Sequence, residues 1–203
     1  YSIAGGTWNT DTTNNIAIDG SVRTSSTLGS RDGMPSVTRL SDGSFAMVIE
    51  AQDYNARSYI RPDGTKTATG YAGLVITLAF SEDGKTWPLE KMRPIAAPTN
   101  LFTTGSLAAG YSCGAPSITT LPDGRVAVSY QSNEDYVGNR SISLPYVLRV
   151  IVSSEPLTCN SDITATEGGV SPSFTALESP FAPVENEYQV WNSVNCLDGS
   201  LYV

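Results

Sequence analysis

The sequence predicts an all-β protein built from repeated four-stranded antiparallel units, and three observations support this. β-branched and aromatic residues occur in short runs bounded by Gly, Pro, Asp and Asn, which is typical of strands separated by turns. No segment keeps an apolar period of 3.6 residues, so we expect no helices. The stretch PSVTRLSDGSFA at 35–46 recurs as PSITTLPDGRVA at 116–127, with seven identical positions at an offset of 81.

Each copy of this stretch predicts a β-hairpin, because an Asp-Gly pair that favours a tight turn separates two strand-like runs. A third and weaker copy, NSVNCLDGSLYV, begins at Asn192 and is one residue shorter before its Asp-Gly. After the first copy, GLVITLAF, SEDGKTW and PLEKMRPI predict a second hairpin, which completes a unit of four strands, A to D, over about 75 to 80 residues. After the second copy, YVLRVIVSS and SFTALESPF are expected to be strands C and D.

Four-stranded units that repeat around an axis predict a β-propeller, and the alternative is a β-sandwich with a coincidental duplication. About two and a quarter blades are expected here, as part of a five- or six-bladed propeller. The remaining blades are expected in a segment outside this sequence or in another chain. Within a single domain, 1–203, the expected parts are an outer closing strand (NNIAIDGSVRTSS) and lead-in at 1–30, blades at 31–98 and 99–182, and the start of another blade at 183–203.

Composition excludes several classes of function. The formal net charge of −8 argues against nucleic acid as a partner, because a phosphate backbone is bound by clustered Lys and Arg. No apolar run approaches the roughly 18 residues that a membrane span requires. The chain has no histidine and therefore cannot supply a Ser-His-Asp triad or a His-bearing zinc site. We expect no metal and no cofactor.

Other features favour a secreted protein. Lys is scarce, Thr, Ser, Gly and Asn are frequent, and the charge balance is acidic. Asn139 begins a glycosylation sequon, Asn-Arg-Ser. The sequence begins at Tyr1 without an apolar leader, so a signal peptide is either absent or already removed. Three cysteines, Cys113, Cys159 and Cys196, have no metal-ligand spacing, and their odd number predicts a free thiol or a pairing partner elsewhere.

The turn SEDGKTW resembles the aspartate-box (BNR) repeat of sialidase-like propellers, whose usual form is S-x-D-x-G-x-T-W. The matching residues are Ser81, Asp83, Gly84, Thr86 and Trp87. The Ser-to-Gly spacing is one residue shorter than usual, so either Glu82 takes the place of the Asp or the turn is tighter. The resemblance implies that the Asp side chain bonds turn amides and that the Trp packs between blades. We therefore expect a structural role for this turn; the second unit has SSEPLTCNSD in its place.

Strand order predicts which end of the units is functional. If neighbouring strands are antiparallel, the A–B turns and the C–D turn share one face, and the longer B–C and D–A connections share the other. Long loops are typical of a binding face. The candidate binding residues expected there are Arg31, Asp32, Tyr54, Arg57, Tyr111, Gln131, Asp135 and Tyr188.

The same face carries candidate catalytic acids. Asp53 and Glu134 are equivalent at the offset of 81, and Glu50 is an alternative acid in the first unit. Hydrolysis of a glycoside requires two carboxylates, one as acid and the other as base or nucleophile. Tyr and Arg beside them suit sugar stacking and recognition of hydroxyl or carboxylate groups. Each acid by itself is also typical of a solvated loop residue.

The resemblance implies a secreted glycoside hydrolase that cleaves terminal sugars from a polysaccharide or glycan. Sialidases carry an F/Y-R-I-P motif before the first blade, whereas SRDGMPSV has its Arg and Pro at a different spacing, which argues against sialic acid. Exo-arabinanase-like propellers rely on two glutamates, one in a segment similar to SYQSNED, and Glu134 fits that pattern. The alternatives are a lectin-like propeller that binds glycans without cleaving them and a scaffold within a larger complex.

Overall fold

The computed structural model describes residues 31–52, 74–88, 91–98, 113–134, 146–166, 168–179 and 192–203, together with the backbone of residues 2–3 and 6–7. Apart from a single 3₁₀ position at Lys91, the regular elements in these ranges are β-strands, and all paired strands are antiparallel. The all-β prediction is confirmed. Within the described residues there is no helix long and apolar enough to cross a membrane.

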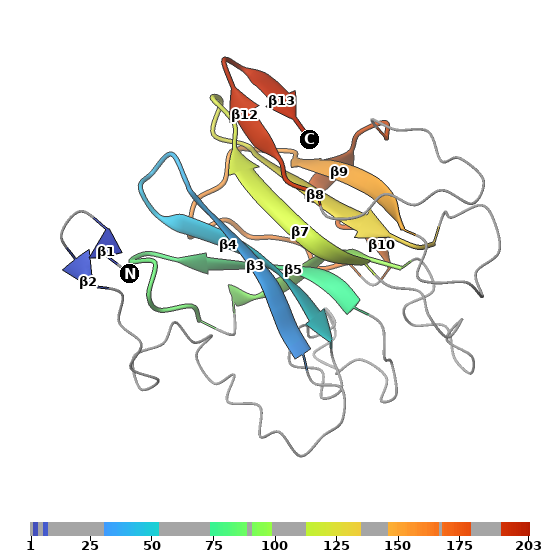
Figure 1. Ribbon diagram of the computed structural model, residues 1–203, viewed down its shortest axis with the longest axis horizontal. Helices are drawn as coiled ribbons and strands as arrows, with labels where there is room; N and C mark the ends of the chain where they lie inside the picture. The colour runs from blue at the N-terminus through green and yellow to red at the C-terminus, as the bar shows by residue number, and fades with distance from the viewer. Residues whose placement is uncertain are drawn as a thin grey trace.

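Two sheets make up most of the described structure (Figure 1). The first has the order β10-β6-β5-β4-β3, formed by β3 (Arg31–Arg39), β4 (Phe45–Gln52), β5 (Leu74–Ser81), β6 (Arg93–Ala97) and β10 (Gly169–Val170). The second has the order β11-β9-β8-β7, formed by β7 (Cys113–Thr120), β8 (Val126–Ser132), β9 (Val147–Ser153) and β11 (Phe174–Ala176). Two small hairpins complete the set: β1 (Ser2–Ile3) with β2 (Gly6–Thr7), and β12 (Asn195–Leu197) with β13 (Ser200–Tyr202).

The three copies of the Asp-Gly hairpin form two kinds of turn. In the first two, only the Gly of the Asp-Gly pair has a positive φ, 89° at Gly43 and 85° at Gly124, and each turn closes with the same two backbone hydrogen bonds of 2.8 and 3.0 Å. In the third, Asp198 (φ 50°) and Gly199 (φ 76°) are both left-handed, as a two-residue type I′ turn requires. The missing residue of the third copy therefore shortens the loop while keeping the hairpin.

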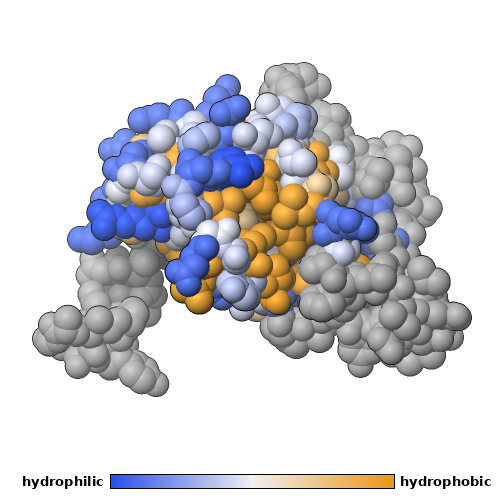
Figure 2. Space-filling model, turned by 90° about the horizontal axis from the view of Figure 1, so that it is seen from above, coloured by the Kyte–Doolittle hydropathy of each residue, from blue (hydrophilic) through white to orange (hydrophobic). Residues whose placement is uncertain are grey.

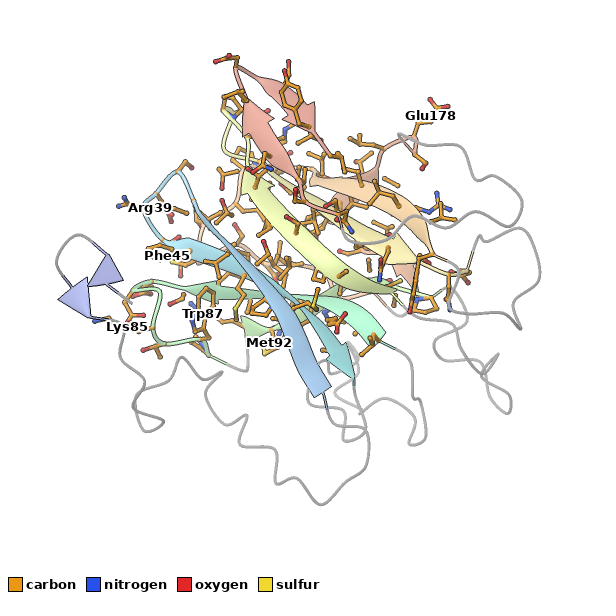
Figure 3. The ribbon with its side chains drawn as sticks, viewed as in Figure 1. Arg39, Phe45, Lys85, Trp87, Met92 and Glu178 are labelled. Carbon is orange, nitrogen blue, oxygen red and sulfur yellow. The ribbon has the colours of Figure 1, made fainter. Side chains whose placement is uncertain are left out.

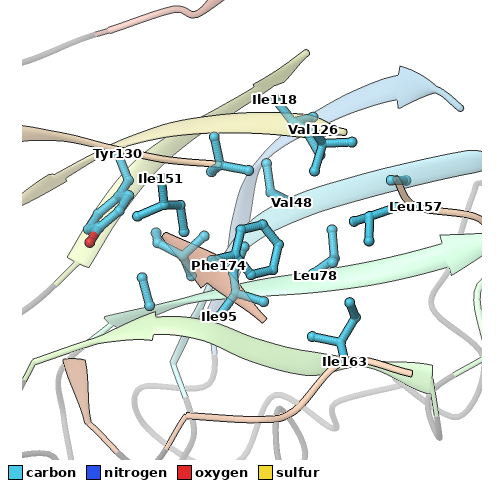
Figure 4. Close-up of a cluster of buried hydrophobic side chains, with 14 of the residues drawn as sticks. Val48, Leu78, Ile95, Ile118, Val126, Tyr130, Ile151, Leu157, Ile163 and Phe174 are labelled. Carbon is cyan, nitrogen blue, oxygen red and sulfur yellow. The ribbon is translucent and has the colours of Figure 1, made fainter. Parts of the chain in front are cut away.

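The main core lies between the two sheets. Successive side chains of a strand point to opposite faces, so Val48 of β4 and Leu78 of β5 face the second sheet. They meet Val126 of β8, Ile151 of β9 and Phe174 of β11 (Figure 4). The outward-facing residues of the first sheet form another buried cluster, and a third cluster joins the second sheet to the β12–β13 hairpin. The units are thus stacked face to face in sequence order.

The stacking step between neighbouring units is repeated. Ser36 of β3 accepts a hydrogen bond at Oγ from the backbone N–H of Ile118 on β7, at 3.1 Å. Ser117, the equivalent residue at the offset of 81, accepts one from the backbone N–H of Val194, also at 3.1 Å. The third copy therefore meets the second as the second meets the first.

The connection between β9 and β11 differs from its counterpart in the first unit. The fourth strand expected in SFTALESPF is present as β11, but the chain before it first crosses to the outer edge of the other sheet. There Gly169 and Val170 pair with β6, and the backbone N–H groups of Thr166 and Ser171 donate to Pro94 and Ile95, both at 2.9 Å. The second unit thus supplies the fifth strand of the first sheet, although the sequence pattern assigned each unit its own strands. The expected closing strand in 1–30 lies outside the described residues.

The three cysteines do not pair with one another. Cys113 and Cys159 are buried in the cluster between the sheets, and Cys196 is half-buried on β12.

Candidate functional site

The turn after β5 is organised by one carboxylate. Oδ1 of Asp83 accepts hydrogen bonds from the backbone N–H groups of Lys85 and Thr86, both at 2.8 Å, and Oδ2 accepts the Thr86 hydroxyl at 3.2 Å. Ser81 Oγ donates to Asp83 Oδ1 at 3.0 Å, whereas Glu82 is exposed. The backbone bonds from Thr86 and Lys85 lower the pKa of Asp83 from 3.8 to about 2. The sequence left open whether Glu82 takes the place of the Asp or the turn is tighter, and the structure shows the tighter turn, in which Asp83 bonds the turn amides.

Trp87 anchors this turn to the first sheet. Its side chain is 1% exposed and belongs to the outer cluster of that sheet, which also contains Met47 and Met92 and has Phe45 packed against it. Figure 3 labels Trp87, Met92 and Phe45 in this region. All described members of this cluster come from the first unit, so within the described residues Trp87 packs on its own sheet rather than between the two units. A Cβ at Gly84, whose φ is 72°, would lie 3.3 Å from the Phe45 ring. The turn is a structural element.

The tight turns of both units lie at one end of the sheets. Gly124, in the A–B turn of the second unit, lies against Ser41 of the first A–B turn and Pro156 of the second C–D connection. The backbone N–H of Leu157 donates to the Gly124 carbonyl at 3.0 Å. This grouping agrees with the face deduced from antiparallel pairing.

At the opposite end, each unit carries the same backbone irregularity. The pairing of β3 with β4 shifts between Gly33 and Ser36, and that of β7 with β8 shifts at the equivalent place. Within these bulges Met34 has a φ of 52° and Ala115, its equivalent, a φ of 47°. A positive φ is uncommon for residues other than Gly, and bulges are over-represented next to active sites. The candidate functional end is therefore also the strained end.

Glu50 lies at this end and contacts the second unit. Its side chain is only 4% exposed, and Oε2 accepts a hydrogen bond of 3.0 Å from the backbone N–H of Ala115. A Cβ on Gly114 would lie 2.9 Å from the same oxygen, so this close approach requires glycine. Gln131, which pairs with Gly114, approaches the same place, with Nε2 3.8 Å from that Cβ position. This contact gives Glu50 a structural role between the units.

Glu134 lines a pocket between the two sheets at the same end. The pocket has a volume of about 160 Å³ and is lined by Glu134 and Tyr130 from the second A–B hairpin, Arg149 from β9, and Ala97 and Val170 from the first sheet. The lining of the pocket is partly polar and partly apolar. Glu50 is not among the lining residues. Glu134 and Arg149 are half-buried, so the pocket combines a carboxylate, a guanidinium group and an aromatic side chain.

The remaining sequence candidates are only partly placed. The backbones of Arg31 and Asp32 lie on β3, paired with Gln52 and Ala51, at the end that carries the bulges. The other candidates fall outside the described residues: Asp53, Tyr54, Arg57, Tyr111, Asp135, Asn139 and Tyr188.

Arg149 is a pocket residue that our reading of the sequence missed. It stands in the middle of the apolar run VLRVIVS, and a charged residue inside such a strand is a signal that could have identified it. Tyr130 gave no comparable signal, because a Tyr in a β-strand is ordinary.

No metal-binding arrangement is evident in the described ranges, where no group of three or more Cys, Asp or Glu side chains converges. Comparison of the chain with protein-family models, curated proteins and solved structures finds no match.

Proposed function

We propose that this chain is part of a secreted glycoside hydrolase of the sialidase-like type, which cleaves terminal sugars from a polysaccharide or glycan. The observation that carries the proposal is the pocket at the end of the sheets opposite the tight turns, with Glu134, Arg149 and Tyr130 in its lining. A concave site with a few convergent polar groups is the usual setting of a small-molecule site.

A propeller is the architecture that we propose for this enzyme. Its support is the repeated contact from Ser36 to Ile118 and from Ser117 to Val194, which relates three successive units by the same step. The blades of a propeller are related by one repeated step, and these two contacts relate the units in that way. The two units and the hairpin that the structure describes do not by themselves close a ring, so the proposal places the remaining blades in another segment or another chain.

The proposed chemistry uses a pair of carboxylates. Glu134 is one of them, and Asp53, its equivalent in the first unit, is the other; one protonates the leaving oxygen while its partner acts as base or nucleophile. A separation of about 5 Å would give retention, and roughly 6.5 to 9.5 Å would give inversion. Arg149 orients the sugar through its fixed donors, and Tyr130, which is 5% exposed, contributes to the pocket lining. Glu50 is a positioning residue, because its bond to Ala115 holds the two units together.

The test is hydrolysis of a panel of chromogenic aryl glycosides by the wild type and by Glu134→Gln. The amide keeps the shape of the side chain and removes its charge, so we expect turnover to collapse while sugar binding survives. Glu155→Gln is the matched control, because Glu155 is exposed at the end of the tight turns, and its turnover should equal that of the wild type. If Glu134→Gln and Asp53→Asn both hydrolyse at near-native rates, the assigned pair is wrong.

Glycan binding without cleavage is the second candidate function. The hydrogen bond from Ala115 to Glu50 favours binding without cleavage, because Glu50, one of the candidate acids of the first unit, has an oxygen that already accepts from the backbone. Retention on a glycan array, with no aryl glycoside cleaved, would establish this function in place of hydrolysis.

A further inference from the structure

The second unit carries the segment SSEPLTCNSD, residues 153–162, in place of the turn that follows β5 in the first unit. This segment contacts the first unit through Cys159. The backbone N–H of Cys159 donates to Ser44 Oγ at 3.2 Å, and its carbonyl accepts a hydrogen bond of 3.3 Å from Lys91 Nζ. The segment is therefore held against the neighbouring unit by bonds to two different parts of that unit.

The end of this segment is a turn closed by its own hydroxyl groups. The backbone N–H of Thr158 donates to Ser161 Oγ at 2.8 Å, and that of Asn160 donates to Thr158 Oγ1 at 3.2 Å. The backbone N–H of Ser161 donates to the Thr158 carbonyl at 3.0 Å. These bonds fix the backbone of 158–161, so the turn holds its polar residues at a defined place beside the first unit.

A pocket of about 220 Å³ lies between the two units at this turn. It is lined by Lys91 and Arg93 from the first unit and by Cys159, Asn160, Ser161, Asp162 and Ile163 from the second. Two of the lining residues are cationic and one is anionic, whereas the whole chain has a formal net charge of −8. The pocket is therefore a locally positive place in an acidic protein.

The pocket belongs to the end of the sheets that carries the tight turns. Ser44, to which Cys159 donates, directly follows Gly43 of the first A–B turn. The tight turns of the first unit lie on the left in Figure 1, and in Figure 2 the left side of the described surface is mainly hydrophilic, with apolar surface toward the middle. This end is thus suited to a polar ligand, and it is opposite the end that carries the bulges.

The two cationic side chains are positioned by bonds to the backbone. Lys91 and Arg93 are both half-buried, and they flank Met92, which is buried. Arg93 Nη1 donates to the Met92 carbonyl at 2.8 Å, which orients the guanidinium group. Lys91 Nζ uses one of its three donors for the Cys159 carbonyl. Both positive groups are thereby kept at the wall of the pocket.

We propose that this pocket binds a tetrahedral oxyanion, sulfate or phosphate, as the free ion or as an ester on a larger molecule. Guanidinium and ammonium groups form charge-assisted hydrogen bonds with the oxygens of such anions. Asn160 and Ser161, on the wall from the second unit, add amide and hydroxyl donors, so oxygens on different sides of one tetrahedron can each meet a donor. The exposed carboxylate of Asp162 opposes binding, and its removal therefore tests the sign of the charge that the ligand carries.

Arg93 is the main anchor in this proposal. Lys91 also lines the neighbouring pocket, together with Glu82 and Asp83 of the turn after β5, so its ammonium group is shared with two acids. Arg93 lines only the pocket between the units among the pockets described here, and its planar group presents donors in a fixed fork that matches two oxygens of one anion.

The inference goes beyond the proposed function and does not rest on it. The site lies at the end of the sheets opposite the pocket that contains Glu134, and its readout is binding rather than hydrolysis. The two experiments therefore fail separately.

The experiment is isothermal titration calorimetry of the full chain with sodium sulfate and with sodium phosphate at low, constant ionic strength. Sodium chloride is the blank. We expect saturable binding of both tetrahedral anions by the wild type. Arg93→Gln should weaken it roughly tenfold or more, because the variant loses charged hydrogen bonds, and Lys91→Met should weaken it less. Arg93→Lys, which keeps the charge but loses the fork, should lie between the wild type and Arg93→Gln.

Two further variants test the electrostatics. Asp162→Asn should bind the anions roughly fivefold more tightly, because it removes the opposing charge. Lys85→Ala is the matched control, because Lys85 is exposed on the turn after β5 and lines neither pocket, and its affinity should equal that of the wild type. Thermal melting of each variant shows that it is folded.

The same titration identifies the source of the anion. A monosaccharide sulfate ester that binds more tightly than inorganic sulfate and the parent sugar would support an ester on a glycan, whereas tighter binding of the inorganic ion would support the free anion. Absence of saturable heat with both inorganic anions and with the ester would overturn the proposal. Wild-type affinity in both Arg93→Gln and Lys91→Met, or weaker binding by Asp162→Asn, would overturn it as well.

Discussion

Replacement of Trp87 by alanine tests whether the turn after β5 is structural. The indole is 1% exposed, and Met47 and Met92 are buried in the same outer cluster of the first sheet. Removal of a buried Trp side chain costs about 3–5 kcal/mol, through the loss of transfer free energy and the cavity that remains. In a domain of this size each kcal/mol lowers Tm by about 2–4 °C, so the expected decrease is roughly 6–20 °C.

Trp87→Phe is the matched control for this substitution. The indole Nε1 is buried and has no hydrogen-bond partner among the residues that the structure describes, so phenylalanine sacrifices no hydrogen bond. It keeps much of the apolar surface, and at about 25 cal/mol per Å² we expect a loss of about 1–2 kcal/mol. We therefore expect the Tm of Trp87→Phe to lie below that of the wild type, and the Tm of Trp87→Ala to lie lower still.

The assay combines thermal melting followed by circular dichroism with sugar affinity of the folded variants. Affinity should not change, because the turn lies at the end of the sheets opposite the pocket that contains Glu134. A Trp87→Ala protein that melts within 2 °C of the wild type, outside the range worked out above, would contradict the packing argument. Weaker sugar binding at an unaltered Tm would show that the functional end has been assigned to the wrong side.

Three further predictions follow from particular contacts. The pKa of Asp83 is lowered from 3.8 to about 2, so the stability that its carboxylate contributes is complete above about pH 4 and is lost as the pH falls toward 2. The difference in Tm between the wild type and Asp83→Asn should therefore shrink as the pH falls from 4 to 2, and it should not change between pH 5 and 7. Gly114→Ala should lower the free energy of unfolding measured in urea, because the new Cβ would meet Glu50 Oε2 at 2.9 Å. The decrease should be smaller in a Glu50→Ala background, and additive effects of the two substitutions would contradict the contact. Ser36→Ala and Ser117→Ala each remove the acceptor of a backbone N–H on the neighbouring unit, so both should cost about 1–3 kcal/mol, and a clear inequality would show that the two steps are not equivalent.

The amino-acid sequence determined the hairpins, because the information for them is local. Alternating β-branched residues and an Asp-Gly pair specify two strands and their turn within about twelve residues, without reference to the rest of the chain. The duplication at an offset of 81 then matched Ser36 with Ser117, and antiparallel pairing alone placed the tight turns at one end. The deletion in the third copy was also visible, and its effect is the type I′ turn at Asp198 and Gly199.

Only the tertiary structure decided what each polar residue contacts, since those partners lie far apart in the sequence. Glu50 was a candidate acid in the sequence, but its Oε2 accepts a hydrogen bond from the backbone N–H of Ala115, 65 residues away. No local sequence pattern marks the interface between the units in which this hydrogen bond lies. Arg149 became a pocket residue because the edges of two sheets meet beside it. The strand at Gly169 and Val170 joins the first sheet because β6 presents an open edge there. Such contacts depend on how complete sheets pack, and packing is a property of the folded surfaces rather than of any single segment.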